Sequence, residues 1–365
     1  MSAIDNRADG AGDGEETSSD SQREAVWARL LAWYAAEGRA ELPWRHTRDP
    51  YAILVSEVML QQTQVDRVLP KYRAFLARFP TLAALAAAPR AEVIQEWAGL
   101  GYNARAVRLH EIARQAVERF GGGLPDTLDG LLALKGIGRY TAGAVACFAF
   151  GLSVATVDTN IRRVLWRVFR GIEPPTWPAG VQATREALAL AEWALPVERA
   201  YDWQQALMDL GATVCLARRP FCERCPLAPL CRAYQETARV TLFPSGEALA
   251  RLRDERDDAP RRLVAEERAG YDAGELVKPR LAKKTGLPFT QTSRYFRGRV
   301  IAALRELPTG QSLTLSTLGV QVREGYTKDE AQWLAGLVDG LARDGLARWI
   351  EPAGDENERR VALPE

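Results

Sequence analysis

Residues 134–151 read LKGIGRYTAGAVACFAFG, a glycine-rich turn followed by an apolar stretch with helical character. Glycine permits a tight turn between two helices, because it adopts backbone conformations that other residues avoid. Such a turn also exposes backbone N–H groups at the start of the second helix, and these donors suit one phosphate of DNA. Taken alone, the turn is equally compatible with a helix connection that binds nothing.

The sequence on both sides of this turn has the periodicity of helices. Apolar residues recur every three or four positions in residues 25–35, 68–79, 105–120 and 181–195. Glycine or proline marks the short connections, and no stretch alternates as a strand would. We therefore predict an all-α domain over residues 22–234.

Two segments outside this domain have a different composition. Residues 1–21 are polar, acidic and glycine-rich, which predicts a disordered acidic tail. Residues 235–287 are dense in charge and poor in large apolar side chains, which predicts a charged linker.

The last block, residues 288–365, again contains enough apolar residues for a core. It carries two amphipathic helical patterns, RYFRGRVIAALREL and KDEAQWLAGLVDGLARDG. Two short strand-like stretches, LARWIEP and RRVALPE, flank a polar turn. We predict a small winged-helix-like α+β module.

The bulk composition excludes some classes and leaves others open. The 365-residue chain has a net charge of +1, but the acidic N-terminal segment hides a body of about +6. That balance is compatible with nucleic-acid binding and with many neutral enzymes. No apolar run approaches the roughly 20 residues that span a bilayer, and no signal peptide is visible. We expect a monomeric, cytoplasmic protein without a membrane partner.

Four of the five cysteines lie in CLARRPFCERCPLAPLC, residues 215–231. One C-x-x-C pair has an outlying cysteine on each side, whereas zinc sites usually combine two such pairs. The compact loop favours a [4Fe–4S] cluster, while zinc and unligated thiols stay as alternatives. Four arginines of this stretch and its edge suit either a phosphate-facing surface or a solvated loop: Arg218, Arg219, Arg224 and Arg232.

Two carboxylates are candidates for acid–base chemistry. Glu57 lies among apolar residues in SEVMLQQTQV, where burial would raise its pKa so that it carries a proton near neutrality. An exposed position on a polar helix face is the alternative. Asp158 opens an amphipathic helix, either as a simple N-cap or as a functional anion kept ionised by the helix dipole. One protonated and one ionised carboxyl group are the pair that glycosidic cleavage requires.

These motifs occur together in one known arrangement. LPWR, SEVMLQQTQV, GLGY, LKGIGRYTAGAV, VDTN-x-x-RVL and the cysteine loop resemble, in order, the helix-hairpin-helix DNA glycosylases of the endonuclease III superfamily. Within that superfamily the chain is most similar to the MutY-type adenine DNA glycosylases. The resemblance covers residues 22–234, about 60% of the chain.

The resemblance implies an enzyme of base excision repair that acts on double-stranded DNA with a mismatched or oxidised base. It would flip out adenine paired with 8-oxoguanine or guanine and hydrolyse the N-glycosidic bond. Glu57 matches the family's catalytic acid, Asp158 the residue that stabilises the sugar cation, and Asn160 a nearby asparagine. Tyr140 stands where the lyase branch has a Schiff-base lysine, which implies a monofunctional enzyme.

The resemblance also implies ligands and DNA contacts. Cys215, Cys222, Cys225 and Cys231 match the [4Fe–4S] ligands of the family. The matching DNA-binding residues are Gln61, Gln62, Thr63, Leu100, Tyr102, Lys135, Gly136, Gly138 and Arg139.

The chain departs from the family pattern in two places. Asn103 replaces a second aromatic residue beside Tyr102, and residues 235–365 do not resemble the Nudix-like domain of MutY-type enzymes. The C-terminal block therefore stays open as a second DNA-binding surface, a partner-docking module or a structural cap. Release of thymine from T·G mismatches, or a non-catalytic cluster-bearing DNA-binding role, are the alternatives for the whole protein.

Overall fold

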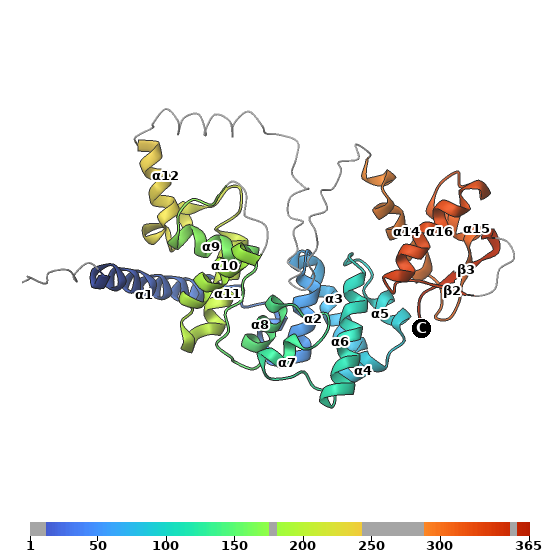
Figure 1. Ribbon diagram of the computed structural model, residues 1–365, viewed down its shortest axis with the longest axis horizontal. Coiled ribbons are helices and arrows are strands. Elements are labelled where there is room, and N and C mark those ends of the chain that lie inside the picture. The colour runs from blue at the N-terminus through green and yellow to red at the C-terminus, as the bar shows by residue number, and fades with distance from the viewer. Residues whose placement is uncertain (1–11, 175–180, 243–287, 351–355) are drawn as a thin grey trace, which may run out of the picture. The chain divides into compact units, whose positions relative to one another are not determined.

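The computed structural model describes residues 12–174, 181–242, 288–350 and 356–365. The chain divides into two compact units, whose elements are labelled in Figure 1. The first unit comprises Met1–Arg45 and Ala146–Tyr271, and the second comprises His46–Val145 and Asp272–Glu365. Residues 22–234, which the sequence predicts as one domain, therefore contribute to both units.

The first unit is helical throughout its described residues. Its elements are α1 (Gly12–Glu37), η1 (Pro43–Arg45), α9 (Thr159–Phe169), α10 (Val181–Trp193), η2 (Val197–Arg199), α11 (Ala200–Thr213), η3 (Cys222–Arg224), η4 (Ala228–Leu230) and α12 (Arg232–Leu242).

Two boundaries of this unit differ from the prediction. Helix α1 begins at Gly12, so part of the segment predicted as a disordered tail is helical. No proline stands between Gly12 and Gln22 to stop the helix. Helix α12 continues to Leu242, into the predicted linker. Residues 1–11 and 243–287 lie outside the described residues.

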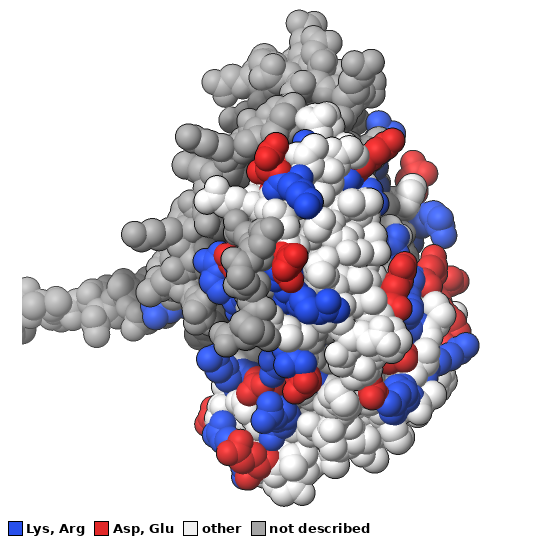
Figure 2. Space-filling model, turned by 90° about the vertical axis from the view of Figure 1, so that its right-hand side faces the viewer, with Lys and Arg blue, Asp and Glu red and all other residues white. Residues whose placement is uncertain are grey.

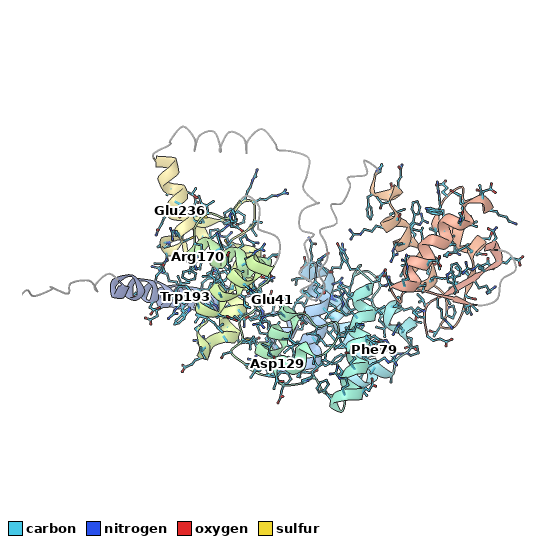
Figure 3. The ribbon with its side chains drawn as sticks, in the orientation of Figure 1. Glu41, Phe79, Asp129, Arg170, Trp193 and Glu236 are labelled. Carbon is cyan, nitrogen blue, oxygen red and sulfur yellow. The ribbon has the colours of Figure 1, made fainter. Side chains whose placement is uncertain are left out.

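The core of the first unit forms where α1 and α9 pack against α11. Leu30, Trp203 and Leu210 are almost completely buried there. At the other side of α9, Phe169 meets Trp193 edge-on, with ring centroids 5.0 Å apart; Trp193 is labelled in Figure 3. Aromatic pairs of this geometry add to the stabilisation that burial gives.

A buried carboxylate connects the end of α1 to α11. The side chain of Asp209 on α11 is only 1% exposed. Arg45 donates two hydrogen bonds to it, of 2.7 and 2.6 Å, and Arg39 donates through its backbone N–H and its side chain. Burial raises the pKa of Asp209, but the hydrogen bond and charge of Arg45 and the charge of Arg39 outweigh it, so the pKa lies below its usual value.

The second unit contains the glycine-rich turn and the C-terminal block. Its N-terminal part consists of α2 (Pro50–Leu60), α3 (Val65–Arg78), α4 (Leu82–Ala87), α5 (Arg90–Glu96), α6 (Ala104–Phe120), α7 (Leu128–Leu132) and α8 (Arg139–Phe148), and the division between the units falls within α8.

Helix α2 is the centre of this part and is buried from Tyr51 to Met59. Asp49 caps its start by accepting hydrogen bonds from the N–H groups of Tyr51 and Ala52, and Pro50 provides the preformed first turn. A helix that is enclosed on all sides must bury its polar side chains too. This explains why α2 carries few of them.

The C-terminal block folds as a helical module with a small sheet. Its elements are η5 (Phe289–Gln291), α14 (Ser293–Arg305), β1 (Leu313–Thr314), α15 (Leu315–Val322), η6 (Lys328–Glu330), α16 (Ala331–Arg343), β2 (Arg348–Ile350), η7 (Glu356–Glu358) and β3 (Arg360–Ala362).

The sheet of this module has the antiparallel order β1-β3-β2. Trp349 on β2 pairs with Val361 on β3, and Leu313 on β1 pairs with the same Val361. The two strands expected near the C-terminus are present, whereas the sequence analysis did not predict β1 or α15. The prediction of a mainly helical chain is confirmed, and no helix among the described residues is long and apolar enough to cross a membrane.

The module shares its hydrophobic core with α5. Ala91 and Ile94 of α5 belong to the same buried cluster as Val300, Ile301 and Leu304 of α14. The C-terminal block is therefore packed onto the N-terminal part of the second unit, and α14 contacts α5.

Replacing Asp209 with asparagine should destabilise the first unit. The change leaves the buried Arg45 without a counter-charge, which costs about 3–5 kcal/mol of unfolding free energy at pH 7. Because the folded-state pKa is depressed, this stabilisation is present above the unfolded-state pKa of about 4 and is lost as the pH falls through the folded pKa.

Urea unfolding should therefore show that Asp209→Asn has a lower free energy of unfolding than the wild type at pH 7. This difference in unfolding free energy should become smaller below pH ~4. Asp202→Asn is the matched control, because Asp202 forms only an exposed pair with Arg199. A gap of equal size at both pH values would contradict this account of Asp209.

Candidate functional site

Glu57 is a buried residue of α2, with 7% of its surface exposed. The alternative of an exposed glutamate on a polar face is therefore wrong. Its neighbour Ser56 is also buried and donates its hydroxyl hydrogen to the carbonyl of Ile53. Enclosure of α2 on all sides, which local periodicity does not reveal, places this carboxyl group in the protein interior.

The C-terminal end of α2 is bound by Arg105, a buried residue of α6. Its Nη1 group donates to the carbonyl oxygens of Val58, Met59 and Gln61, at 2.8, 2.9 and 2.6 Å. These carbonyls lie at the end of the helix, where no further turn supplies donors. Arg105 therefore acts as a side-chain cap for α2, directly after Glu57.

The Nη2 group of Arg105 binds the loop between α5 and α6. It donates to the carbonyls of Leu100 and Gly101, both at 3.1 Å, and to the hydroxyl of Thr63 at 3.0 Å. The guanidinium also lies 5.3 Å from the ring centroid of Trp97. Burial lowers the pKa of Arg105 to about 10, and within the described chain its partners are neutral.

The two loops held by Arg105 contain strained residues. Gln62, with φ of 56°, and Tyr102, with φ of 45°, are the non-glycine residues with positive φ in the described chain. Both side chains are exposed, and Tyr102 retains 40% of its surface. Strain of this kind persists only where the surroundings enforce it, and here Arg105 does so. The structure thus presents two residues with a predicted DNA contact on neighbouring loops.

Leu100 differs from the other predicted DNA contacts in these loops. Its side chain is 2% exposed and lies in the core, so only its backbone carbonyl participates, as an acceptor for Arg105. The GLGY motif therefore offers Tyr102 as the surface residue and uses Leu100 as its anchor.

The glycine-rich turn forms a helix-hairpin-helix between α7 and α8. Gly136 has φ of +104°, and a Cβ there would lie 2.7 Å from Cγ of Arg108, so this position requires glycine. Gln115 on α6 holds the turn by accepting from the N–H of Lys135 at 2.9 Å and donating to its carbonyl at 3.1 Å. Gly138 does not have positive φ, and a Cβ there would meet open space.

The residues predicted to bind DNA at this turn are on the surface. Lys135, Gly136 and Arg139 are exposed, and Gly138 and Tyr140 are partly exposed. Helix α8 begins at Arg139, and the first N–H groups of a helix have no carbonyl partner within it. Surface exposure and positive side chains therefore coincide at the start of α8.

Asp158 caps α9 in the first unit. Its carboxylate accepts from the N–H of Ile161 at 2.6 Å and from Nδ2 of Asn160 at 3.0 Å. Burial raises the pKa of Asp158 above its usual value, although these hydrogen bonds and the charge of Arg163 oppose the shift. These hydrogen bonds and the charge of Arg163 therefore do not offset the effect of burial on the pKa of Asp158.

One arginine joins Asp158 to the cysteine loop. Arg163 donates to Oδ1 of Asn160 at 2.8 Å and to the carbonyl of Cys215 at 2.8 Å. Asn160 in turn donates to Asp158. The N-terminal turn of α9 and the start of the cysteine loop are thus connected through two side chains.

Arg167, one turn further along α9, binds the same loop. It donates to the carbonyls of Leu216 and Ala217, both at 2.8 Å, and to Sγ of Cys215 at 3.4 Å. The thiol of Cys231 donates to the carbonyl of Arg167 at 3.3 Å. Helix α9 therefore serves as the support for both ends of the loop.

The four thiols of the loop are reduced and partly exposed. Burial raises the pKa of the Cys225 thiol to about 12, and the charges of the other three cysteines add to this effect. Among the described residues, no group of three or more His, Cys, Asp or Glu side chains converges closely enough for a single metal ion.

The donor set nevertheless fits a [4Fe–4S] cluster. Such a cluster takes four thiolates, and it is wider than a single ion, so its ligands stand further apart. Four cysteines on one loop that α9 holds at both ends meet this requirement. All four arginines predicted for this surface are exposed, and Arg232 pairs with Glu236 at 3.1 Å.

Sequence reasoning missed the residues that hold the site together. Arg105 and Arg163 were not singled out, although each is a charged residue within a helical apolar pattern. That conflict between charge and an interior position was the available signal. It could not identify the bonding partners, which lie 42–52 positions away for the longest contacts.

Comparisons with known proteins agree with these features. Residues 55–184 match the model of the HhH-GPD superfamily of base excision DNA repair proteins. The chain is 46% identical to an adenine DNA glycosylase of Mycolicibacterium smegmatis, covering 61% of this chain and 72% of that protein. It is also 46% identical to the human adenine DNA glycosylase, covering 60% of this chain and 41% of the human protein.

A solved structure described as a thermostable thymine-DNA glycosylase is also similar. Its TM-score is 0.54 at 32% identity, with 60% of this chain and 99% of that chain covered. The alignments span about two fifths of the length of the mammalian relatives. The chain belongs to the HhH-GPD superfamily of base excision DNA repair proteins, in its MutY-type adenine DNA glycosylase family.

Replacing Arg105 with lysine should loosen both loops while keeping the positive charge. A lysine cannot reproduce the planar fork, so several buried carbonyls lose their donor, at about 1–3 kcal/mol each. We expect a loss of about 3 kcal/mol or more in unfolding free energy.

The rate of backbone amide hydrogen exchange should rise in residues 58–63 and 99–103. Arg114→Lys is the control, since Arg114 is an exposed residue of the same helix; equal exchange in the two variants would refute the proposed role of Arg105.

Proposed function

We propose that this protein is a monofunctional adenine DNA glycosylase that hydrolyses the N-glycosidic bond of adenine mispaired with 8-oxoguanine or guanine. The observation that carries the proposal is the position of Glu57. Glu57 lies one residue before Val58, the first of the carbonyls near the end of α2 that Arg105 binds. Through its other hydrogen bonds, Arg105 connects this end of α2 to the loops that carry the exposed Gln62 and Tyr102. A carboxyl group that can protonate a base thus lies close in sequence to the helix end and loops that Arg105 holds together, and these loops carry the residues proposed to contact DNA.

The proposed reaction divides the work between two carboxyl groups. Glu57 donates a proton to a ring nitrogen of the flipped adenine, and the electrons of the glycosidic bond leave with the base. Asp158, as an anion, stabilises the positive charge that develops on the sugar. Water, activated with the help of Glu57, then attacks the sugar carbon and leaves an abasic site.

Asn160 and Arg163 support Asp158 in this scheme. Desolvation raises the pKa of Asp158, so its ionised form depends on the hydrogen bonds that it accepts. Asn160 donates one of them and is itself oriented by Arg163. The developing cation on the sugar would further favour the anionic carboxylate during the reaction.

Tyr140 indicates that the enzyme has no lyase activity. A lyase requires an amine that attacks the sugar and forms a Schiff base, and a phenol has no such chemistry. With tyrosine at the start of α8, we propose that the product is an intact strand with an abasic site.

The hairpin and the two loops would bind the duplex. We propose that Lys135, Arg139 and the amides at the start of α8 bind one phosphate, with Gly136 giving the close backbone approach. Tyr102 would fill the gap left by the extruded base, beside Gln61, Gln62 and Thr63. No second copy of the chain is needed for these roles, so we propose a monomer.

Cys215, Cys222, Cys225 and Cys231 would hold the [4Fe–4S] cluster. When bound, the cluster supplies a rigid cross-link for the loop rather than a step of the hydrolysis. Arg218, Arg219 and Arg224 would then lie on a fixed surface that meets phosphates with little loss of conformational entropy.

Thymine release from T·G mismatches is the second candidate. The similar thymine-DNA glycosylase structure favours it. The buried Glu57 favours adenine, since protonation of a purine leaving group requires an acid at that place.

Single-turnover base release on four duplexes tests the proposal: A opposite 8-oxoguanine, A opposite G, A opposite T, and T opposite G. We expect rapid release from the first two, with strand breaks only after alkali. Glu57→Gln should lower release by a factor of about 100 or more while duplex binding persists. Release of thymine alone, or strand cleavage without alkali, would overturn the assignment.

Loss of one cluster ligand should affect binding before chemistry. We expect Cys222→Ser to lower the thermal stability of the protein and to weaken duplex binding, because the loop loses its cross-link. Iron content and the visible absorption of the purified protein report the cluster directly. Cys147→Ser is the control, because Cys147 is a buried thiol outside the loop; a Cys222→Ser protein with wild-type affinity would refute the role.

A further inference from the structure

The C-terminal module reaches the loop that carries Tyr102. The guanidinium of Arg294, at the start of α14, lies 4.8 Å from the centroid of the Tyr102 ring. Arg105 lies 5.6 Å from the same centroid. The exposed tyrosine is therefore contacted by one arginine from its own part of the second unit and by one from the C-terminal module.

The same module also forms a hydrogen bond with Asn103, the residue that follows Tyr102. Arg305, at the end of α14, donates to Oδ1 of Asn103 at 2.8 Å and to the carbonyl of Ile94 at 2.8 Å. Gln95 returns a hydrogen bond to the carbonyl of Leu307 at 3.0 Å. Asn103 is the position at which the sequence departs from the aromatic residue of related proteins, and here its side chain binds the module.

These contacts fix α14 along its length. Its end is anchored by Arg305 and by the buried cluster of Ile94 with Val300 and Leu304. Its first turn packs against α16 through the edge-on contact between Phe296 and Trp333, whose ring centroids lie 5.0 Å apart. Arg294 is therefore carried by a rigid helix and not by a free arm.

The arginines of α14 differ in how their charge is used. Arg297 pairs with Asp344, Arg299 donates to the carbonyl of Gln321 at 2.6 Å, and Arg305 is engaged in the packed contact described above. Arg294 is exposed, and among the residues that the structure describes it has no acidic partner. Its positive charge stands beside the tyrosine without being neutralised.

The surrounding surface is not a general positive field. Figure 2 shows Lys and Arg mixed with Asp and Glu around a broad uncharged area on the side that carries the C-terminal module. Attraction of DNA to this face by net charge alone is therefore weak. A contact made here depends on individual arginines in fixed places.

We propose that the C-terminal module extends the duplex-binding surface, with Arg294 binding a backbone phosphate beside the base step that Tyr102 enters. Tyr102 and Arg294 form one contact element in which the aromatic ring enters the stack and the guanidinium binds the adjacent phosphate. This inference rests on the proposed function, in which Tyr102 meets the duplex. It assigns the module a DNA-binding role rather than that of a partner-docking domain or a cap.

The salt dependence of duplex binding tests this proposal. Each phosphate contact contributes about 0.9 to the slope of log Kd against log salt concentration. In the full-length Glu57→Gln background, which keeps the duplex uncleaved, Arg294→Ala should lower that slope by about 1 and weaken binding roughly tenfold at low salt. Arg294→Lys should restore the slope, because a lysine still pairs with a phosphate.

Arg299→Ala is the matched control, since it removes an exposed arginine from the same helix. It should leave the slope at the parental value, and all variants should share the parental melting temperature. An Arg294→Ala slope equal to the parental one, or an equal fall in Arg299→Ala, would overturn the proposal. The salt slopes are measured from binding alone, so they do not depend on catalysis. If the wild type released no base from any of the four duplexes, the proposed function would be rejected instead.

Discussion

The second unit depends on the burial of one guanidinium group without a counter-ion. Burying a charge is costly unless its hydrogen-bonding capacity is used. The two terminal amino groups of Arg105 donate to carbonyl oxygens from the end of α2 and from the loop before α6, while its buried Nε has no acceptor among the described residues. The solution has a geometric consequence. If the end of α2 or the loop before α6 moved, the guanidinium of Arg105 would lose an acceptor. The carboxyl group of Glu57 and the exposed ring of Tyr102 are therefore held in fixed positions relative to one another.

In the first unit, buried charged side chains are stabilised by ion pairs and by hydrogen bonds to neutral acceptors. Asp209 is balanced by two arginines, whereas Arg163 uses neutral acceptors at Asn160 and in the cysteine loop. Helix α9 therefore has two tasks, since its first turn orients Asp158 and its body supports the loop. This arrangement would give the proposed cluster a structural role. A loop that loses its shape removes an acceptor from Arg163 and so disturbs Asn160, the partner of Asp158.

Periodicity and glycine placement predicted the strongly amphipathic helices and the hairpin, because both patterns are local properties. Gly136 shows why the hairpin was predictable, as its positive φ and close approach to Arg108 leave no other residue possible. The surface alternative for Glu57 could not be excluded, since burial of α2 results from helices distant in sequence. Helix α15 and the early start of α1 were missed for a related reason, because each follows from a short or polar segment with weak apolar periodicity.

The departure at Asn103 and the unusual C-terminal block are best understood as one change. The amide oxygen of Asn103 accepts the hydrogen bond that Arg305 donates, whereas a phenylalanine or tryptophan at this position would offer no oxygen. Burial lowers the pKa of Arg305 to about 10, and the described residues place no acid in this contact. A module that buries such an arginine requires acceptors on the surface beneath it, and Asn103 and the carbonyl of Ile94 supply them. Asn103 thus helps to attach the module whose Arg294 lies 4.8 Å from the centroid of the Tyr102 ring. The positive charge beside Tyr102 is then a consequence of the same docking geometry.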